Sequence, residues 1–260
     1  MKTVSMAQRG NVEDRTVTLR NRARLGANQN LLFWYRELYR DQFKDFPNPT
    51  ELAILEIGSG TSPLKQFFSN VITSDVLDLE YLDLVFDCHD IDKLEAIKDQ
   101  SLDVITLTNV LHHLKNPIAF LNRAAKKLKP DGKVIATEPF FSVLSTPIFK
   151  YLHHEPVDTG SFEPELKQIQ GPLTSANIAL PWLIFFRHPD WLEKLSEHYD
   201  LERCSVRMFS ALSYMLSGGI SRKLPIPNWV YRTLFPADLF FSRRLPRMCA
   251  SFFTVVLPRR

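Results

Sequence analysis

One apolar run contains an acidic side chain and is followed by two glycines, a pattern with the chemistry of a nucleotide-type binding site. Residues 52–57 suit a strand that is buried on both faces, as in a parallel sheet, and they include Glu56. Gly58 and Gly60 come next, and glycines there allow a sharp turn and let a ligand lie against bare main chain. Ser62 can cap the helix that opens after this turn. Strand, glycine turn and helix start together predict a nucleotide-binding corner, although a plain structural turn can carry the same glycines.

Polar side chains that can bind a ligand also close the other predicted strands. Four further apolar runs have the length and composition of strands, at residues 71–75, 82–87, 102–107 and 133–137. The polar side chains at the ends of the five strands are Glu56, Asp75, Asp87, Asn109 and Glu138. Asp75 stands about where a doubly wound fold places a carboxylate for ribose hydroxyls, and a carboxylate can accept two hydrogen bonds from a vicinal diol. Because ligands bind beyond the carboxyl ends of parallel strands, we expect these residues to share one site.

Helical patterns separate these strands, so the elements that must position the site alternate along the chain. Helices are expected at residues 64–68, 92–98, 117–128 and 189–199, and two more strands at 201–208 and 250–257. In the turn at residues 129–132, we expect proline to set φ and Gly132 to take the left-handed position. Alternating strands and helices predict right-handed βαβ units around a parallel sheet, and hence an α/β fold.

The segment before the first strand has two parts. Residues 1–25 are polar and arginine-bearing and lack the apolar core of a secretory signal, so we expect a loose, solvated arm. Residues 30–43 predict a helix with apolar and aromatic side chains on one face. That face either packs on the sheet, which we favour, or also covers the binding corner and offers Tyr35 or Tyr39 to the site.

Length and composition bound the class of protein. The 260 residues suit one large α/β domain, or a core with a substantial insertion. The net charge of +3 is too small to indicate a nucleic-acid partner. Three cysteines lie far apart without zinc-site spacing, which predicts reduced thiols in the cytoplasm. The longest apolar stretches are shorter than the roughly 20 residues of a spanning helix.

The order and spacing of five motifs resemble those of the class I S-adenosylmethionine (SAM)-dependent methyltransferases. The motifs are LEIGSGTS, the acid in ITSDV, VFDCHDI, SLDVITLTNVLHHL and LKPDGKVIATEP, and they cover residues 50–140. The resemblance is to the type 11, ubiquinone/menaquinone-methyltransferase-like group. Three later pieces, LHHEP, GPLTSAN-IALPW and YMLSGGIS, also resemble those of a bacterial branch of this family. The resemblance implies a Rossmann-like sheet of seven strands with helices on both faces and inserted cap or lid segments. It also implies an antiparallel seventh strand beside the sixth, and SAM as the cofactor.

The resemblance implies roles for the residues of the glycine turn. By it, Glu56 orients the ammonium group of the methionine part of SAM, and the Asn109 backbone carbonyl meets the same group. The turn of Gly58, Ser59 and Gly60 lies against the methionine part.

Three further cofactor residues follow from the same resemblance. Asp75 binds the ribose hydroxyls, Asp87 accepts from the adenine amino group, and the Cys88 backbone amide contacts the ring. One position departs from the family pattern, because Ser62 stands where the family has its third glycine. Its side chain either crowds the methionine carboxylate or binds it through the hydroxyl.

Two pairs of neighbouring polar residues are candidates for catalysis. His112 and His113 belong to an LHHL pattern that is common in this group, and we expect them to pack and to hydrogen-bond beneath the site. His154 and Glu155 lie in the irregular segment 141–188, next to the transferring methyl group in this fold. We predict them as a base or substrate-positioning pair, with capping inside a loop as the alternative. Neighbouring loop histidines need not converge, so we predict no metal site.

The sequence divides into four parts with different expected tasks. Residues 1–49 form the arm and a covering helix, 50–140 the SAM-binding core, 141–188 a substrate or lid insertion, and 189–260 the completion of the sheet. A second insertion at residues 220–247 is rich in aromatic and arginine side chains. It packs as an ordinary cap with snorkelling arginines, walls a pocket for an apolar or glycolipid-like molecule, or rests on a membrane surface.

These features predict a SAM-dependent methyltransferase that acts on a small-molecule acceptor. O-methylation is the first hypothesis, and a lipid- or sugar-linked acceptor is compatible with the second insertion. A catalytically inactive SAM-binding scaffold or regulatory protein is the alternative. We expect a cytoplasmic protein, with peripheral membrane contact as an option, and the sequence does not indicate the oligomeric state.

Overall fold

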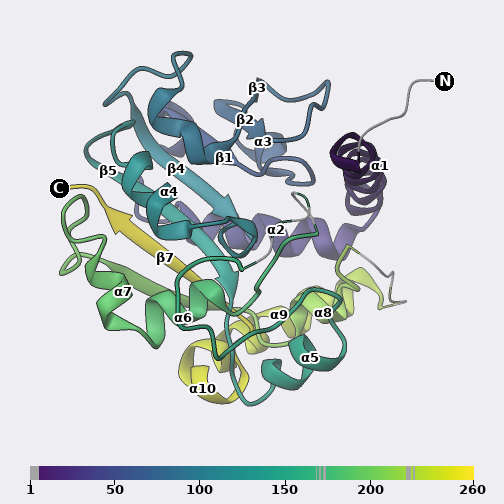
Figure 1. The fold of residues 1–260 in the computed structure, drawn as a ribbon. Helices are drawn as coiled ribbons and strands as arrows, with labels where there is room; N and C mark the ends of the chain where they lie inside the picture. Colours follow the sequence, from purple (N-terminus) through teal and green to yellow (C-terminus); the bar gives the residue numbers. More distant parts are fainter. Residues whose placement is uncertain (1–5, 168, 170, 172–173, 221–223, 225) are drawn as a thin grey trace.

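A seven-stranded sheet forms the centre of the computed structural model, which describes residues 6–260 apart from 168, 170, 172–173, 221–223 and 225 (Figure 1). The strands are β1 (Ile54–Ile57), β2 (Val71–Asp75), β3 (Leu84–Val85), β4 (Leu102–Thr108), β5 (Leu128–Pro139), β6 (Ser205–Phe209) and β7 (Phe252–Pro258). Their order is β3-β2-β1-β4-β5-β7-β6. The first five are parallel, and β7 runs antiparallel between β5 and β6. The Rossmann-like sheet and its antiparallel last strand are therefore confirmed.

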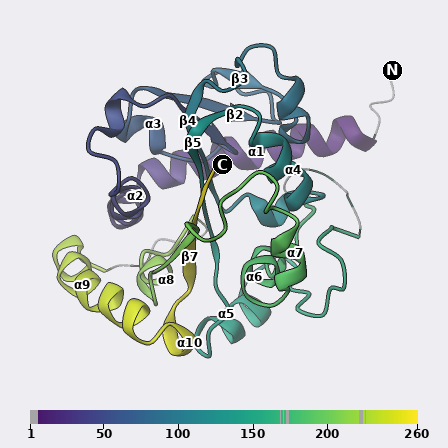
Figure 2. The same cartoon turned by 90° about the vertical axis from the view of Figure 1, so that its left-hand side faces the viewer.

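Helices cover both faces of the sheet, as expected (Figure 2). The α-helices are α1 (Met6–Gly26), α2 (Gln29–Gln42), α3 (Leu64–Phe67), α4 (Pro117–Ala124), α5 (Ser145–Tyr151), α6 (Leu180–Phe186), α7 (Pro189–Glu193), α8 (Ser213–Leu216), α9 (Asn228–Arg244) and α10 (Pro246–Cys249). Short 3-10 helices are η1 (Pro49–Glu51), η2 (Cys88–Lys93) and η3 (Leu111–His113). Alternate strand residues feed two cores, because side chains point to opposite faces. One core lies under α4, α6 and α7, and the other lies under α2 and α9.

The N-terminal segment differs from the prediction. Residues 6–26 form helix α1, so the expectation of a loose arm is wrong for this part, and residues 1–5 lie outside the described residues. Asn28 lies between α1 and α2. Its side chain caps α2 by accepting from Leu31 N at 3.1 Å, and it donates to Ser217 O after α8 at 2.8 Å. Leu25 and Thr18 of α1 are buried. The helix has few apolar residues and no clear apolar stripe, which is why its sequence did not reveal it.

Several predicted elements are shorter than expected. Strand β3 has only two residues, and the helix expected at 92–98 is replaced by the 3-10 helix η2. Helix α7 ends at Glu193 instead of continuing to residue 199. In the turn that precedes the main part of β5, Asp131 and not Gly132 has a positive φ, of 61°. Gly132 is needed for space instead, since a Cβ there would stand 2.9 Å from Lys129 O.

The two predicted insertions contain regular structure. The segment 141–188 holds α5 and α6 at its ends, with irregular chain between them. In the segment 220–247, residues 221–223 and 225 lie outside the described residues, and the rest is largely the 17-residue helix α9. Within the described part of the chain, no helix combines the length and apolar character that crossing a bilayer demands.

Candidate active site

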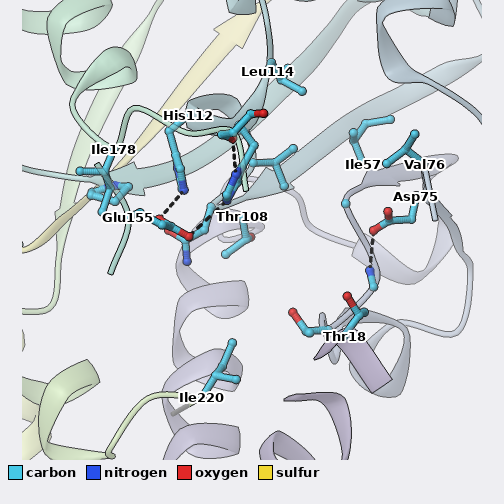
Figure 3. Close-up of a pocket in the computed structure, with 18 of the residues that line it drawn as sticks. Thr18, Ile57, Asp75, Val76, Thr108, His112, Leu114, Glu155, Ile178 and Ile220 are labelled. Atoms are coloured by element: carbon cyan, nitrogen blue, oxygen red, sulfur yellow. Dashed lines mark hydrogen bonds and ion pairs between the residues drawn. The ribbon is translucent and has the colours of Figure 1, made fainter. Parts of the chain in front are cut away.

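One cavity of about 1340 Å³ opens beyond the carboxyl ends of β1, β2, β4 and β5 (Figure 3). Its floor includes Gly58, Asp75 and Asn109, which end or follow three neighbouring strands. Its walls come from α1, from the segment around Glu155 and from the turn at Gly218. Figure 3 shows Asp75 and Glu155 on opposite sides of this space. The strand ends thus open into one hollow that the rest of the chain encloses.

Four residues that line this hollow lie in the left-handed region, and two of them, Gly58 and Asn109, come directly after strands. Gly58 has φ +75°, and a Cβ on it would stand 2.4 Å from a methyl carbon of Val110. Only glycine fits there, because any side chain would be both strained and in collision. Asn109 has φ +57°, and its buried Oδ1 has no hydrogen-bond partner among the described residues. Both residues line the cavity, and the orphaned Asn109 oxygen is a buried acceptor beside it.

Asp75 ties the glycine turn to the end of β2. Its Oδ2 accepts from Gly60 N at 3.0 Å, and its Oδ1 accepts from Leu77 N at 3.0 Å. Burial raises the pKa of Asp75, although these backbone hydrogen bonds oppose the rise. Each carboxylate oxygen has a second lone pair, so the group can still accept from a ligand in the cavity.

Asp87 and Cys88 line the same end of the cavity. Asp87 Oδ1 accepts from His89 N at 2.9 Å, which begins the 3-10 helix η2. Burial raises the pKa of the Cys88 thiol, so this side chain stays protonated and packs as an apolar group. These two residues and Asp75 come from neighbouring elements and all line the cavity.

Glu56 and Ser59 lie behind the glycine turn and are not among the residues that line the cavity. Glu56 is only 2% exposed, and it accepts hydrogen bonds from the hydroxyls of Ser59 and Ser62. Burial raises the pKa of Glu56 to about 7. The Ser62 hydroxyl also meets Tyr39 Oη at 2.9 Å and accepts from Leu64 N at 3.2 Å. Glu56 therefore supports the turn through hydroxyls in this structure, and its contact with the cofactor stays a prediction.

Helix α1 supplies a wall that the sequence did not reveal. Thr18 and Asn21 line the cavity. Nearby, Arg22 stacks on Tyr81 with its guanidinium carbon 3.9 Å from the ring centroid, and Tyr81 Oη donates to Gly60 O at 2.5 Å. From helix α2, Tyr35 also lines the cavity. A tyrosine on the α2 face was one of two interpretations of that helix, whereas no sequence signal pointed to α1.

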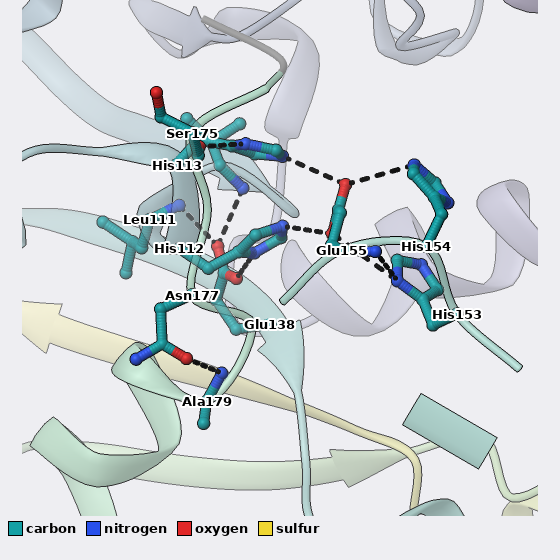
Figure 4. A network of polar contacts seen from close by, with 11 residues as sticks. Leu111, His112, His113, Glu138, His153, His154, Glu155, Ser175, Asn177 and Ala179 are labelled. Carbon is teal, nitrogen blue, oxygen red and sulfur yellow. Dashed lines mark hydrogen bonds and ion pairs between the residues drawn. The ribbon is translucent and has the colours of Figure 1, made fainter. Parts of the chain in front are cut away.

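Four histidines surround Glu155 at the other end of the cavity (Figure 4). His112 Nε2 lies 3.3 Å from Glu155 Oε2, and His113 Nε2 lies 3.5 Å from Glu155 Oε1. His153 Nδ1 and His154 Nε2 each lie 3.8 Å from a Glu155 oxygen. The two histidine pairs, which were not expected to meet, therefore converge on one carboxylate.

A second carboxylate holds His112 from below. Glu138 Oε2 accepts from His112 Nδ1 at 2.6 Å, and Glu138 Oε1 accepts from the backbone amides of Val110 and Leu111. Burial alone would lower the pKa of His112, but the charges and hydrogen bonds of Glu138 and Glu155 raise it to about 10. Burial likewise opposes the charge of Glu155, but His112 and His113 hold its pKa well below the usual range.

A protein-family model described as "Methyltransferase domain" matches residues 32–202, more than half of the chain. The chain belongs to this methyltransferase family. With its seven-stranded sheet it is a class I methyltransferase, and its cofactor is SAM.

Curated relatives match shorter parts of the chain. The ubiquinone biosynthesis O-methyltransferase of Neisseria meningitidis serogroup A is 32% identical over 80 residues, which are 31% of this chain and 29% of that protein. The probable polyketide synthase 10 of Dictyostelium discoideum is 39% identical over 57 residues, 22% of this chain and 2% of that protein. The chain thus spans less than a third of the length of these relatives. A SAM-dependent methyltransferase structure from Archaeoglobus fulgidus has a TM-score of 0.49 at 14% identity, and the match covers 86% of this chain and 94% of that one.

The cofactor end of the cavity fits SAM in its chemistry. SAM carries a ribose diol, an ammonium and a positive sulfonium, which need acceptors and negative charge nearby. Asp75 supplies a carboxylate with lone pairs toward the cavity, and Asn109 supplies an oxygen that lacks a partner. The bare backbone at Gly58 leaves room for a ligand atom to approach.

The structure distributes the predicted residues between lining and support. The cofactor candidates that line the cavity are Gly58, Gly60, Asp75, Asp87, Cys88 and Asn109. Of the catalytic candidates, Glu155 lies at the centre of the histidine cluster, and the side chain of His154 is 79% exposed at its rim. His112 and His113 had been expected to act beneath the site, yet both line the cavity beside Glu155. Their role there could not be found from the LHHL pattern alone, because it depends on a segment that lies about forty residues away in sequence.

Proposed function

We propose that this chain transfers the methyl group of SAM to a small-molecule acceptor held at the Glu155 end of the cavity. The observation that carries this proposal is the single cavity shared by Asp75 and Glu155, whose two ends differ in chemistry. One end offers carboxylates and bare backbone for an adenosyl group. The other end offers histidines, a carboxylate and apolar walls for a second molecule. A cavity that held only the cofactor would not need the second end.

Each cofactor residue has a proposed contact. Asp75 binds the ribose hydroxyls, Asp87 accepts from the adenine amino group, and the backbone of Cys88 contacts the ring. The remaining candidates meet the methionine part, with Glu56 and Ser59 acting from behind the turn that they support. The set proposed for the methionine part is Glu56, Gly58, Ser59, Gly60 and Asn109.

The acceptor end suits a partly apolar molecule with one polar head. Its lining combines the Glu155 cluster with aromatic and aliphatic side chains, namely Phe149, Ile178, Tyr214, Ile220 and Phe252. We propose a hydroxyl as the acceptor, in line with the printed name of the Neisseria relative. A lipid- or sugar-linked acceptor would fit a polar head of this kind on an apolar body.

The chemistry is an in-line displacement that needs alignment more than activation. The acceptor oxygen forms a bond to the methyl carbon, the bond from carbon to sulfur breaks, and its electron pair returns to sulfur. The hydroxyl proton leaves through His154 at the solvent rim, while Glu155 positions the histidines that face the acceptor. Holding the two molecules in line can contribute about 7–11 kcal/mol.

The test separates an enzyme from a scaffold. Titration of the purified chain with SAM and with its demethylated product should give binding of both, and incubation with hydroxyl-bearing acceptors should release the demethylated product. SAM binding without release of the demethylated product across a broad acceptor panel would favour the inactive scaffold. Membership of a methyltransferase family makes the enzyme the first hypothesis. Absence of binding for both molecules would refute the proposal.

We also propose that the outer face of α9 and α10 rests on a membrane surface while the chain works in the reducing cytoplasm. Large apolar side chains are exposed there beside exposed arginines, and the apolar set is Trp229, Leu234, Phe240, Phe241, Leu245 and Met248. Trp229 is 73% exposed, and Arg244 lies 5.8 Å from the ring of Phe240. Arginine heads beside apolar bodies suit an anionic lipid surface.

Vesicle co-sedimentation tests this surface. Replacing Trp229 and Phe240 together by alanine should reduce binding to anionic vesicles by roughly tenfold or more, because two large apolar groups are lost. Phe162→Ala is the matched control, since Phe162 is 88% exposed in another part of the chain. Equal sedimentation of the wild type with anionic vesicles and without vesicles would refute the membrane proposal.

A further inference from the structure

The Glu155 cluster brings two imidazole nitrogens and a carboxylate to one point on the cavity wall. The candidate ligand atoms of His112, His113 and Glu155 all lie within 4.8 Å of one another. The two histidines come from the 3-10 helix after β4, and Glu155 comes from the irregular segment after α5. All three line the cavity. Figure 4 shows the two rings directed at Glu155.

Hydrogen bonds on the far side fix which nitrogen of each ring faces the carboxylate. His112 Nδ1 lies 2.6 Å from Glu138 Oε2, and His113 Nδ1 lies 3.0 Å from Ser175 O. A carboxylate and a backbone carbonyl can only accept, so both Nδ1 atoms carry hydrogen. Without a metal ion, Glu138 and Glu155 favour a proton on His112 Nε2. A metal ion would take the place of that proton, and both Nε2 atoms would then present lone pairs to it beside the Glu155 oxygens. Acceptors that face one another in this way need a cation between them, either protons or a metal ion.

The distances fit a metal ion better than direct hydrogen bonds. The contacts of His112 and His113 with Glu155 measure 3.3 and 3.5 Å. Charge-assisted hydrogen bonds from nitrogen to carboxylate are shorter, at about 2.7–2.9 Å. Two ligands bound at about 2.0–2.1 Å to a tetrahedral zinc ion lie about 3.3–3.4 Å apart. Each nitrogen-to-oxygen contact is close to this edge length, and the two contacts run to different oxygens of Glu155.

We propose that His112, His113 and Glu155 bind a divalent metal ion of the zinc type, with its open position toward the acceptor end of the cavity. Two histidines and one carboxylate are a known catalytic zinc ligand set, which leaves the remaining position to water or substrate. Glu138 acts in the outer shell, since a carboxylate behind a ligating histidine orients its ring. His153 and His154 lie 3.8 Å from Glu155 oxygens and remain outside the proposed three ligands.

The metal would serve the acceptor, and this part of the inference rests on the proposed function. A bound divalent ion would supply positive charge that stabilises an alkoxide, so an acceptor hydroxyl beside it would give its proton to His154 more readily. The alkoxide oxygen then forms the bond to the methyl carbon as the carbon–sulfur bond breaks and its electron pair returns to sulfur. The binding of the metal itself does not depend on this step.

The test measures metal binding without any turnover. The full chain is stripped with a chelator, dialysed against Zn²⁺ and analysed for bound metal, and Co²⁺ is added in a parallel experiment. The wild type should bind one Zn²⁺ with a Kd of roughly 1 µM or tighter. Co²⁺ should develop the intense visible absorption of a four-coordinate ion.

Variants locate the site. His113→Ala and Glu155→Gln should each weaken Zn²⁺ binding by at least about a hundredfold, because only two of three ligands remain. Glu138→Gln should weaken it by roughly 10–100-fold, since His112 loses its orienting acceptor. His198→Ala is the control and should bind like the wild type, because His198 does not line the cavity.

Three results would overturn the inference. The first is a Zn²⁺ affinity of the wild type that is no higher than that of Glu155→Gln. The second is a Co²⁺ absorption spectrum that stays that of the hydrated ion. The third is wild-type Zn²⁺ affinity in the folded His113→Ala variant. The last would move the site elsewhere, for example to the group of Asp87, Cys88 and His89. A SAM titration of the metal-free chain separates this inference from the proposed function. SAM binding without metal binding would refute only the metal site, and metal binding without SAM binding would refute only the proposed function.

Discussion

At the scale of single residues, Asp75 combines a structural and a proposed ligand role. Its two oxygens hold the amides of Gly60 and Leu77 and still face the cavity. Asp75→Asn keeps the shape but replaces one acceptor oxygen by a donor. Because a hydrogen bond to a charged group contributes about 1.5–3 kcal/mol, SAM binding should weaken by roughly ten- to a hundredfold. Isothermal titration with SAM measures the change.

The neighbouring Asp78 gives a matched control. Asp78 is exposed and does not line the cavity, so Asp78→Asn should bind SAM like the wild type. Equal affinity in Asp75→Asn and the wild type would show that Asp75 does not hold the ribose.

Glu56 should make stability depend on pH in an unusual direction. Its folded-state pKa of about 7 lies above the ordinary glutamate value of 4.5, mainly because the side chain is buried. The folded protein therefore holds this proton more tightly than the unfolded chain does. The free energy of unfolding should fall as the pH rises from about 4.5 to about 7, by an amount on the order of 3 kcal/mol from this group.

Glu56→Gln isolates this contribution, because glutamine does not titrate. Urea unfolding of both proteins at pH 5 and pH 8 should show that the variant gains stability relative to the wild type at the higher pH. Glu80→Gln, at an exposed site, should leave the difference between the two pH values unchanged. If the difference in unfolding free energy between Glu56→Gln and the wild type were the same at both pH values, the raised pKa of Glu56 would be contradicted.

Residues differ in how far sequence reasoning could place them. Gly58, Asp75 and Asn109 follow strand runs, and parallel strands bring their carboxyl ends to one edge, so their shared cavity could be foreseen. Glu155 follows no strand and approaches His112 only because the segment after α5 folds back over the strand ends. No local pattern encodes that return path, because it is set by the packing of the whole insertion.

At the scale of elements, helix α1 closes against the glycine turn. A Cβ on Gly60 would stand 2.8 Å from Thr18 Cγ2 and 3.0 Å from Asp75 Oδ2. Gly60→Ala should therefore press α1 away from the turn and destabilise the fold by about 1–3 kcal/mol. Thr18→Ser removes the methyl group in the way, so the double variant should recover part of the loss in both unfolding free energy and SAM affinity.

Gly26 gives the matched glycine control, since a Cβ there would meet nothing within 4 Å. Gly26→Ala should therefore leave stability unchanged or slightly higher. A double variant no more stable than Gly60→Ala would mean that the contact with α1 is not what excludes a side chain from the turn.

Elements with a strong repeat were predicted, and those without one were not. The runs of β1, β2, β4 and β7 are apolar enough to be recognised as strands, and α2 has an apolar face at helical spacing. Helix α1 lacks such a face, because few of its residues are apolar and its buried residues include the polar Asp14 and Thr18. A polar side chain is buried only where other parts of the fold supply partners for it, and the local sequence does not show those partners.

At the scale of the whole molecule, Asp41 links three elements that are far apart in sequence. It lies on α2, and its carboxylate accepts from Arg207 Nε of β6 at 3.1 Å and from an Arg243 nitrogen of α9 at 2.7 Å. The Asp41 side chain is 6% exposed and that of Arg207 is 13% exposed, so this link lies between the packed elements. Through this link, helix α9 of the second insertion is bound to helix α2, which covers the sheet.

Asp41→Ala should destabilise the whole fold and leave the cofactor end intact. Arg207 would keep Asp45 at 2.7 Å but lose a buried charge partner, so we expect a loss of about 1–3 kcal/mol. Asp90→Ala is the control, since its pair with Lys93 is exposed and such pairs contribute about 0–1 kcal/mol. Urea unfolding measures both losses, and SAM titration well below the unfolding midpoint should give the wild-type affinity for each. If Asp41→Ala unfolded no more readily than Asp90→Ala, the insertion would have to be held by its other contacts, such as the hydrogen bonds of Asp238 with Ala211 and Ser213.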